Sequence, residues 1–535
     1  MHNLKRILLG FSILLVSIIT FSSCDDGSTS AYTGVRMIDN TFSPPVVRVH
    51  EGGLVRFYNA GNNPHNVIAT DAAWGSLEDV PKNDYIDVNF DTEGLYKYIC
   101  SYHATPEGDW GMAGSVVVGD IEYQEYTNFT KNDVVNKFSG DVRYVPSIYE
   151  TIQDAVDASN PGDLVLVDRG IYYEEVVVRT PSITIRGIDR NEVIIDGEFE
   201  KANGIIVAGV DGVAVENITA RNALLNGFYW ATSEGYRASY VTAYNNGDYG
   251  IYAFDSVDGI IEHSYASGSP DAGFYIGQCY PCDAVINNVI SENNGLGYSG
   301  TNSGGDLYIV SSVFRNNMGG IAPNTLDSEL LPPERESFII GNHIENNNNS
   351  KAPAWPNQYI TLGNGIIIAG GNNNVIKNNV INDHNLFGVV VTASFDDNYW
   401  PAHGNLVQDN IIINSNKADM ALSGVSNLAN CFKGNSFQTS FPPGIQISGS
   451  CGSNLFARGS DLSGLWSSIA RVVYVNKGSF EVGDWRTMPE PPLQANMPSP
   501  SSYFNNVFPA VDIFANYDID FTNIKLPETA EKYLN

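Results

Sequence analysis

The chain has 535 residues, 43% of them hydrophobic, which is enough for at least two folded domains. Its formal net charge is −31, although charged residues make up only 17% of the sequence. Nucleic acid and anionic membrane surfaces bind through basic patches, so this composition argues against both as partners and fits a protein that stays soluble outside the cell.

The first 23 residues form a targeting segment rather than a fold element. Lys5 and Arg6 precede an apolar stretch over residues 7–21, which is too short to cross a bilayer comfortably. Small residues then precede Cys24, and this pattern resembles the lipobox of bacterial lipoproteins. The resemblance implies cleavage before Cys24, lipidation of its sulfur, and a place in the cell envelope facing the periplasm or the cell surface. An ordinary secretory peptide with a chance cysteine is the alternative, and residues 24–33 are expected to be a tether.

Residues 34–120 are predicted to form a small β-sandwich, because short alternating runs are separated by Gly and Pro turns. The segment also contains two histidines, one cysteine and one methionine, which are the ligand types of a blue-copper site: His65, Cys100, His103 and Met112. A thiolate and two imidazoles form a trigonal set for copper, and a thioether adds a weak axial bond that tunes the potential.

These residues lie in stretches that resemble the plastocyanin and azurin (cupredoxin) family: "DNTFSP", "VRVHEGGLVRF", "NPHNV" and "GLYKYIC". The resemblance implies an eight-stranded Greek-key sandwich with copper on the four residues just named. Eight residues separate His103 from Met112, more than in common plastocyanins, and they include Glu107 and Asp109. Either carboxylate is an alternative axial ligand, and a sandwich that has lost copper is the alternative for the whole domain.

After a linker over residues 121–143, residues 144–455 are expected to form a right-handed parallel β-helix. Ile148, Ile152, Ala155 and Val156 lie on one helical face, and this segment resembles the N-terminal cap helix of such proteins, which covers the open end of the stack. The family includes carbohydrate-active enzymes and the β-helix protein of nitrous-oxide-reductase copper maturation. The fold class is therefore all-β, and residues 456–535 are expected to be an extension that packs on the solenoid.

A repeat of about 23 residues supports the solenoid. It is marked by six glycines at steps of 23, 23, 23, 24 and 22 residues: Gly204, Gly227, Gly250, Gly273, Gly297 and Gly319. Gly365 follows two steps later, and Gly388 follows one step after Gly365. The residue after each glycine is predicted to fill the core. Asparagine clusters before the glycines are predicted to stack at the turns.

The second residue after each glycine must point outward, and three successive coils carry a tyrosine there: Tyr229, Tyr252 and Tyr275. With Asp255, Asp271 and Gln278 they suggest a sugar-binding face, and a ladder that only fixes register is the alternative. Asp255 and Asp271 are also a candidate acid/base pair for glycoside cleavage. No Lys or Arg lies between Arg237 and Arg315. An anionic polysaccharide is therefore not expected there unless the aspartates recruit Ca²⁺.

Export permits disulfides, so Cys279 with Cys282 and Cys431 with Cys451 are expected to be structural bridges. A redox or metal role for the closely spaced pair is the alternative.

Three functions follow from the sequence. The favoured one is a lipid-anchored copper protein that transfers electrons to a redox partner protein, with the β-helix as a carbohydrate-binding or docking scaffold. The second is a polysaccharide-active hydrolase, lyase or epimerase with an accessory copper domain. The third is a copper delivery or storage protein. Only the copper site has a complete set of chemical groups, which favours the first.

Overall fold

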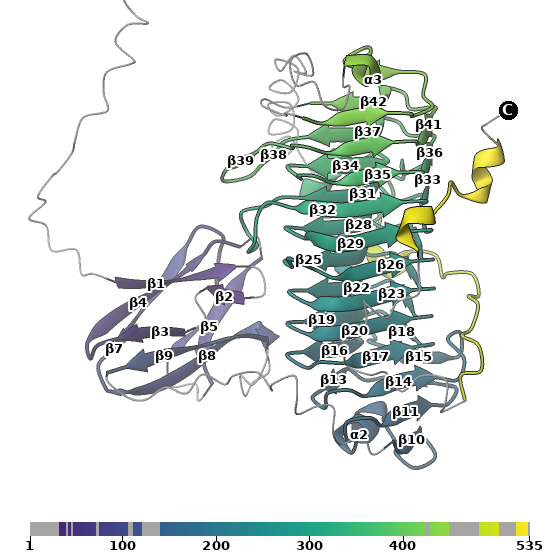
Figure 1. Ribbon diagram of the computed structural model, residues 1–535. Helices are drawn as coiled ribbons and strands as arrows, with labels where there is room; N and C mark the ends of the chain where they lie inside the picture. The colour runs from purple at the N-terminus through teal and green to yellow at the C-terminus, as the bar shows by residue number, and fades with distance from the viewer. Residues whose placement is uncertain are drawn as a thin grey trace, which may run out of the picture.

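The structure, a computed structural model, describes residues 32–38, 41–43, 46–61, 63–70, 74–104, 111–119, 140–423, 429–448, 481–501 and 520–532. Figure 1 shows two folded parts, an N-terminal β-sandwich and a tall stack of parallel coils. Among the described residues, no helix has the length and hydrophobicity needed to cross a bilayer. The all-β fold class expected from the sequence is confirmed.

The sandwich consists of two sheets in the described residues. The four-stranded sheet has the order β2 (Thr41–Ser43), β1 (Tyr32–Ile38), β4 (Gly53–Asn59), β7 (Tyr85–Phe90). The five-stranded sheet has the order β3 (Val46–Val49), β9 (Gly111–Val118), β8 (Gly94–Ala104), β5 (His65–Ala69), β6 (Gly75–Val80). The described strands thus exceed the expected eight by one, because the short β2 pairs with β1 as a separate strand.

An aromatic cluster fills the space between the two sheets. The Tyr98 ring lies 4.8 Å from the Phe42 ring and 4.9 Å from the Phe57 ring, measured between centroids, and Trp74 lies 5.8 Å away. Burial raises the pKa of Tyr98 well above its ordinary value. Strand β8, which carries Tyr98, also carries Cys100 and His103, so this packing fixes the strand that leads to the metal ligands.

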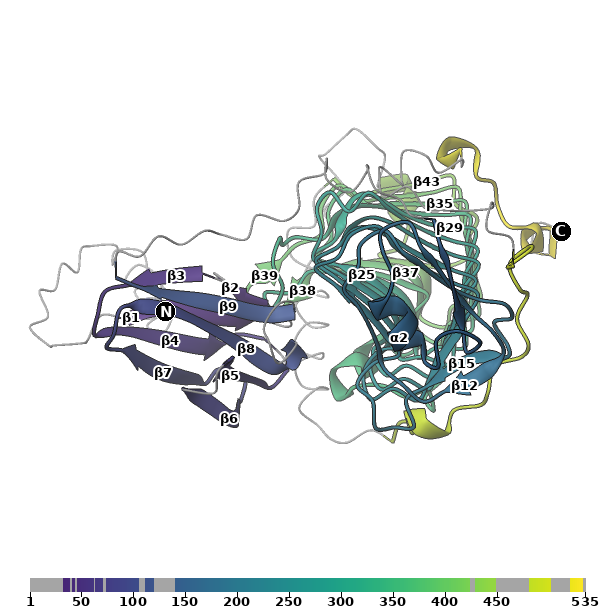
Figure 2. The same cartoon turned by 90° about the horizontal axis from the view of Figure 1, so that it is seen from below.

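A short helix near the start of the solenoid, α2 (Ile152–Asp157), lies across the end of the stack in Figure 2. The Thr151 side chain caps the helix by accepting a hydrogen bond from the backbone N–H of Asp154. Ile152, Ala155 and Val156 are buried against the first coil, as predicted. Ile148 is not part of this face: it precedes the helix and is 67% exposed.

Three parallel sheets form the walls of the stack. The first sheet has twelve described strands: β10 (Val142–Val145), β11 (Leu164–Val167), β14 (Thr184–Gly187), β17 (Val213–Glu216), β20 (Glu234–Ser239), β23 (Val257–Glu262), β26 (Ala284–Asn287), β29 (Gly304–Val310), β32 (Arg335–Ile340), β35 (Val375–Lys377), β40 (Leu406–Gln408), β43 (Cys431–Lys433). The second sheet has ten: β12 (Gly170–Tyr172), β15 (Val193–Asp196), β18 (Thr219–Arg221), β21 (Thr242–Tyr244), β24 (Tyr265–Ser267), β27 (Ile290–Glu292), β30 (Val313–Arg315), β33 (His343–Glu345), β36 (Val380–Asn382), β41 (Ile411–Ile413). Strand β10 starts inside the expected linker because it already pairs with β11.

The third sheet has eleven described strands: β13 (Val176–Val178), β16 (Ile205–Ala208), β19 (Phe228–Ala231), β22 (Tyr249–Phe254), β25 (Ala272–Gly277), β28 (Leu296–Thr301), β31 (Gly319–Asn324), β34 (Ile366–Ala369), β37 (Phe387–Thr392), β42 (Ala418–Leu422), β44 (Ser440–Phe441). A hairpin of β38 (Ser394–Phe395) and β39 (Tyr399–Trp400) projects from the stack. The helical segments that remain are short: α3 (Ile445–Ser448), η1 (Pro356–Thr361), η2 (Trp485–Thr487), η4 (Phe521–Asn523), η5 (Glu528–Lys532).

The repeating glycines lie at the N-terminal ends of strands in the third sheet, where successive coils approach closely. A Cβ atom on Gly204 would lie 2.5 Å from the carbonyl oxygen of Gly227, and one on Gly227 would lie 2.7 Å from that of Gly250. Any side chain there would collide with the neighbouring coil, which explains the repeat. The residues after the glycines, from Ile205 to Val389, are buried in one core, as predicted.

The repeat differs from the prediction in two respects. Tyr298 pairs with Ile321, so the equivalent glycine is Gly320 rather than Gly319. Ile321 then pairs directly with Ile366, so the expected two steps are a single long coil. The additional residues form loops on either side of β32 and β33, over residues 325–334 and 346–365. Spacing alone does not distinguish a missing repeat from a coil with insertions.

Asparagines at the turns form buried ladders, as predicted. The Asn379 side chain donates to the Ile339 carbonyl and to Asn410 Oδ1, both at 2.9 Å. Its own Oδ1 accepts from the backbone and side-chain N–H groups of Asn342 at 2.9 and 3.0 Å. The side chain is 0% exposed, so water does not replace these bonds.

We expect Asn379→Ala to destabilise the solenoid by about 2–3 kcal/mol, because several buried polar groups lose their partner. Chemical denaturation followed by circular dichroism measures the change. Asn385→Ala is the matched control, because Asn385 makes a comparable contact to Asn416 at an exposed turn and should change stability by less than about 0.5 kcal/mol. Equal effects of the two substitutions would contradict the role assigned to burial.

The described C-terminal segments pack along the outside of the stack (Figure 2). The buried Arg190 side chain donates to the Ala495 carbonyl at 3.0 Å, and the backbone N–H of Met497 donates to Asn217 Oδ1 at 2.9 Å. The Phe521 ring stacks on Tyr308 with centroids 3.9 Å apart. Burial lowers the pKa of Arg190 to about 9.

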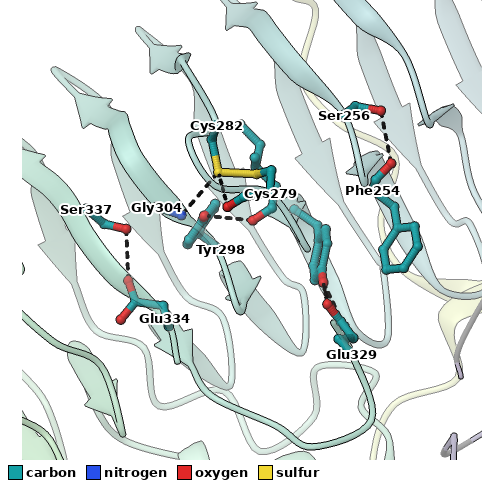
Figure 3. The surroundings of a disulfide bond; sticks show 11 residues. Phe254, Ser256, Cys279, Cys282, Tyr298, Gly304, Glu329, Glu334 and Ser337 are labelled. Atoms are coloured by element: carbon teal, nitrogen blue, oxygen red, sulfur yellow. Dashed lines mark hydrogen bonds between the residues drawn. A yellow bond between two sulfur atoms is a disulfide. The ribbon is translucent and has the colours of Figure 1, made fainter. Parts of the chain in front are cut away.

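Cys279 and Cys282 form a disulfide at the turn between β25 and β26 (Figure 3). The backbone N–H of Gly304 donates to Cys282 Sγ at 3.1 Å, which joins this turn to the next coil. Cys431 is buried in β43. Its expected disulfide partner, Cys451, lies outside the described residues.

A buried carboxyl group, Glu334, lies in the loop before β32 (Figure 3). Ser337 Oγ and Asn374 Nδ2 each donate to it at 2.8 Å. Burial raises the pKa of Glu334 to about 8, although the two hydrogen bonds oppose the shift. The folded state therefore retains this proton over a pH range in which the unfolded chain releases it.

The contribution of Glu334 to stability is fully present below its unfolded pKa of 4.5 and is lost as the pH rises to about 8. Glu334→Gln stays neutral throughout. We therefore expect the variant to gain thermal stability over the wild type at about pH 8 and to match it at about pH 4. Calorimetric melting at both pH values tests this, with Glu336→Gln as the control for a nearby, partly exposed carboxylate. A constant difference between Glu334→Gln and wild type at both pH values would contradict it.

Candidate metal centre

Two neighbouring strands of the five-stranded sheet bring together the two histidines and the cysteine predicted from the sequence. His65 begins β5, while Cys100 and His103 lie near the end of β8, which pairs with both β5 and β9. Cys100 Sγ lies 3.8 Å from His65 Nδ1 and 3.5 Å from His103 Nδ1. One ligand atom from each residue lies within 4.8 Å of the others.

These distances fit a shared first-row metal ion. Bonds of about 2.3 Å to sulfur and about 2.05 Å to nitrogen, at about 120° to each other, place sulfur and nitrogen about 3.8 Å apart. The two observed separations lie at or just below that value. Because the donors are one thiolate and two imidazoles, the set suits copper better than a hard ion such as Ca²⁺ or Mg²⁺.

The surroundings of Cys100 lower the pKa of its thiol and so favour the thiolate. Burial raises the pKa of Cys100, but hydrogen bonds with His103 and His65 lower it, as does the backbone N–H of Asn66, and the net value is about 6. A thiolate is the form that binds copper. Cys100 and His65 are fully buried, whereas His103 is partly exposed, so the site meets the surface at one imidazole.

Strand pairing places Met112 next to this group. Ile99 pairs with Ala113 and Ala104 pairs with Gly111, so the four residues from Cys100 to His103 lie opposite Met112 alone. Met112 is fully buried in the same core cluster as Cys100. The alternative axial ligands, Glu107 and Asp109, lie outside the described residues.

Asn66 connects the two ligand-bearing strands, and sequence reasoning missed it. Its Oδ1 accepts from the Ser101 backbone N–H at 2.8 Å, and its Nδ2 donates to Ser101 Oγ at 2.9 Å. The side chain is 1% exposed. Its position directly after His65 in the "NPHNV" stretch was the available signal, because a polar residue beside a buried ligand is a candidate for orienting it.

The predicted tyrosine row on the third sheet points outward and stacks, but it is covered. The Tyr252 ring lies 5.1 Å from Tyr229 and 4.8 Å from Tyr275, and the three side chains are 7%, 5% and 1% exposed in sequence order. The Tyr275 hydroxyl donates to both carboxylate oxygens of Glu329, which lies in the loop over residues 325–334. Little of these rings is accessible to a sugar in this structure, and their carbohydrate-binding role stays a prediction.

Asp255 and Gln278 occupy equivalent turn positions after the strands of the third sheet, with φ values of 51° and 52°. Burial raises the pKa of Asp255 to about 6, with a hydrogen bond from the Thr232 hydroxyl opposing the shift. Gln278 Oε1 accepts from the Leu330 backbone N–H at 2.8 Å. Asp255 therefore joins the turns of neighbouring coils, whereas Gln278 binds the loop over residues 325–334.

Asp271 lies at the other end of the same strands. Tyr249 pairs with Ala272 and Phe254 pairs with Gly277, so Asp255 is level with Gln278, seven positions from the level of Asp271. At about 3.3 Å per residue the two backbones are roughly 20 Å apart. Glycosidase carboxylates lie about 5–10 Å apart, so Asp255 and Asp271 are not the acid/base pair considered from the sequence. Ca²⁺ binding by these aspartates stays a prediction. In the described residues, the only cluster of three potential His, Cys, Asp or Glu ligands is the one in the sandwich, and it does not include these aspartates.

Comparisons with known proteins agree with both domains. Residues 30–119 match the family of copper binding proteins, plastocyanin/azurin family, and residues 184–331 match the right handed beta helix region. No curated protein matches the chain.

Among solved structures, the novel purple cupredoxin from Nitrosopumilus maritimus is 25% identical over 16% of this chain and 98% of its own, with a TM-score of 0.14. A reduced amicyanin variant is 25% identical over 18% of this chain and 87% of its own, with a TM-score of 0.15. The A-module of the Azotobacter vinelandii mannuronan C-5 epimerase AlgE6 is 16% identical over 54% of this chain and 90% of its own, with a TM-score of 0.42.

The ligand geometry and the matched families lead to one description of the chain. The protein combines a copper-binding cupredoxin domain of the plastocyanin/azurin type, whose type 1 copper-like site consists of His65, Cys100, His103 and Met112, with a right-handed parallel β-helix domain.

Proposed function

We propose that the protein is an electron-transfer protein of the bacterial cell envelope, anchored by lipid at Cys24. The observation that carries the proposal is the compact group of Cys100, His65 and His103, whose ligand atoms already have the separations that a bound ion requires. When bound, copper supplies one-electron chemistry between its two common oxidation states. Every other contribution comes from the residues that hold it.

A rigid ligand set favours electron transfer because little rearrangement accompanies a change of charge. His65 and Asn66 lie on β5, and Asn66 binds Ser101 between the two ligands of β8. The aromatic cluster around Tyr98 packs β8 against the facing sheet. These contacts would hold the side chains of His65, Cys100 and His103 in the same positions in both oxidation states of the copper ion.

The partly exposed His103 offers a route to the surface. The preceding residue, Tyr102, is 47% exposed, and the centroid of its ring lies 6.3 Å from that of the His103 ring. Aromatic side chains beside a ligand provide a contact area for a redox partner protein. The partner would therefore approach over His103 and Tyr102 rather than over the buried His65.

The β-helix is proposed to act as a carbohydrate-binding or docking scaffold. The alternative is a polysaccharide-active hydrolase, lyase or epimerase, and the hydrolase loses support from the separation between Asp255 and Asp271. Copper delivery or storage remains the second candidate for the sandwich, because the same thiolate and imidazoles also bind Cu(I).

The copper site is tested by visible and EPR spectra and by voltammetry of the copper-loaded chain. We expect an intense thiolate-to-copper band and reversible reduction. Cys100→Ser should abolish the band, and Met112→Leu should keep it while raising the potential, because the variant lacks a weak donor that stabilises the oxidised ion. Met37→Leu is the matched control, since Met37 is equally buried in the same core.

A colourless and weakly held copper ion would contradict electron transfer and favour delivery or storage. A potential that responds to Glu107→Gln and not to Met112→Leu would move the axial bond to Glu107. Neither result depends on the β-helix.

The lipid anchor is tested with a metabolic palmitate analogue in a bacterial host. We expect the wild-type chain to be labelled and to sediment with membranes, and Cys24→Ser to be unlabelled and released, because that sulfur is the attachment point implied by the resemblance to a lipobox. Ser28→Ala in the expected tether is the control. An unlabelled wild-type chain in the soluble fraction would support an ordinary secretory peptide instead.

A further inference from the structure

A hollow beside the Cys279–Cys282 disulfide is built differently from the surfaces around it. Its volume is about 340 Å³, and its lining comes from three successive coils: Tyr280, Pro281, Gly305, Asp306, Glu336 and Phe338. The size is at the lower end of the range for small-molecule sites. None of these residues belongs to the tyrosine row or to the copper site.

The turn that forms one side of the hollow is held by several bonds. The disulfide joins the residues on either side of Tyr280 and Pro281. The Cys282 backbone N–H donates to the Gly304 carbonyl at 2.8 Å, and the Gly304 N–H donates to Cys282 Sγ at 3.1 Å (Figure 3). A Cβ on Gly305 would lie 3.0 Å from Pro281 Cα, so the two coils are in close contact.

Tyr280 is exposed although this turn is fixed. Its side chain is 41% exposed, its hydroxyl donates to Glu336 Oε2 at 2.8 Å, and the Arg335 guanidinium lies 3.6 Å from its ring centroid. These contacts leave the ring little freedom. An aromatic side chain that is held in place and partly open is suited to stack on a ligand at a small cost in conformational entropy.

The other side of the hollow has a second aromatic ring and an irregular strand. Phe338 stacks on Tyr308 with centroids 4.6 Å apart, and Tyr308 in turn stacks on Phe521. The pairing of β29 with β32 shifts between Gly304 and Leu307, and Asp306 and Glu336 have φ values of 48° and 60°. Such bulges redirect side chains away from the regular pleat, and here they accompany two carboxylates at the hollow.

The composition of the lining indicates the kind of ligand. Aromatic rings contact the C–H faces of a sugar, while carboxylates accept hydrogen bonds from its hydroxyl groups. The lining contains Asp306 and Glu336 but no cationic side chain, and the Arg335 guanidinium is already placed over Tyr280. An acidic sugar would be repelled by the two carboxylates.

We propose that this hollow, formed by Tyr280, Asp306, Glu336 and Phe338, binds a glycan that lacks acidic groups. The inference rests on the scaffold role proposed above for the β-helix and gives that role a place on the molecule. The site lies where the first parallel sheet follows the disulfide turn, on a different wall of the solenoid from the tyrosine row.

The test is isothermal titration of the full, copper-loaded chain with tetrasaccharides. The uncharged probes are cellotetraose, maltotetraose and N-acetylchitotetraose, and the acidic probes are tetragalacturonate and tetramannuronate. We expect at least one uncharged probe to bind and the acidic probes not to bind. Tyr280→Ala should weaken that binding about tenfold, as is typical for an aromatic anchor. Glu336→Gln should weaken it by a smaller factor.

Tyr173→Ala is the matched control, because Tyr173 is a 57% exposed tyrosine near the start of the same solenoid and should leave binding unchanged. Unaltered thermal unfolding and an unaltered copper spectrum show that each variant is folded, and Glu336→Gln retains the shape of the turn if Tyr280→Ala does not.

Each remaining outcome overturns a defined part of the inference. Uncharged probes that bind equally well to Tyr280→Ala and Glu336→Gln would refute this hollow as the site and leave the scaffold role intact. Acidic probes that bind as tightly as uncharged ones would refute the ligand class. Absence of binding by all five probes would refute both the hollow and the carbohydrate-binding role, while electron transfer would still be judged by the copper spectrum.

Discussion

The hydrogen bonds between backbones of successive coils set the geometry of most of this molecule. They hold neighbouring strands about 4.8 Å apart, so any side chain at an equivalent position lies directly above its counterpart. Glycine is needed where the coils meet most closely, near Gly204 and Gly227, and asparagine is favoured where a turn can bond to the next turn, as at Asn379 and Asn410. Outward aromatic residues such as Tyr252 and Tyr275 stack for the same reason. Regular stacking thus produces ladders of identical chemistry, and a specific site requires an interruption of that regularity.

The copper site and the hollow beside the disulfide both occur at such interruptions. In the sandwich, the pairing of β8 with β9 shifts between Ile99 and Ala104, and the three-residue step from Cys100 to His103 fits within that irregular stretch. In the solenoid, the pairing of β29 with β32 shifts between Gly304 and Leu307, next to Asp306. In each case a regular pair of strands supports a short segment with irregular pairing. Rigid elements thereby position groups that a regular ladder would not bring together.

Much of the architecture could be predicted from the sequence because it depends on local repeats. The core positions after the glycines and the asparagine ladders follow from periodicity, while the ligands His65, Cys100 and His103 follow from side-chain chemistry and the resemblance to cupredoxins. The differences arose where pairing between distant residues decides the outcome. Spacing suggested two coils before Gly365, but Ile321 pairs with Ile366 directly, and the inserted loops only become evident in three dimensions. Asp255 and Asp271 are close in sequence and share a sheet, yet strand direction places them at opposite ends. Asn66 was overlooked because its partner, Ser101, is 35 positions away.

The hydrogen bonds of Arg186 and Arg190 to the C-terminal segment have a consequence for how the chain reaches its final state. Arg190 binds the Ala495 carbonyl across 305 positions, and Arg186 contacts the Pro500 carbonyl across 314. In most solenoids each repeat contacts only its neighbours, so the stack can grow or fray from either end. Here the first coils are also held by residues about 300 positions later in the sequence. The contacts of Arg186 and Arg190 are therefore complete only after residues 495–500 have been synthesised, so the first coils depend on more than their immediate neighbours.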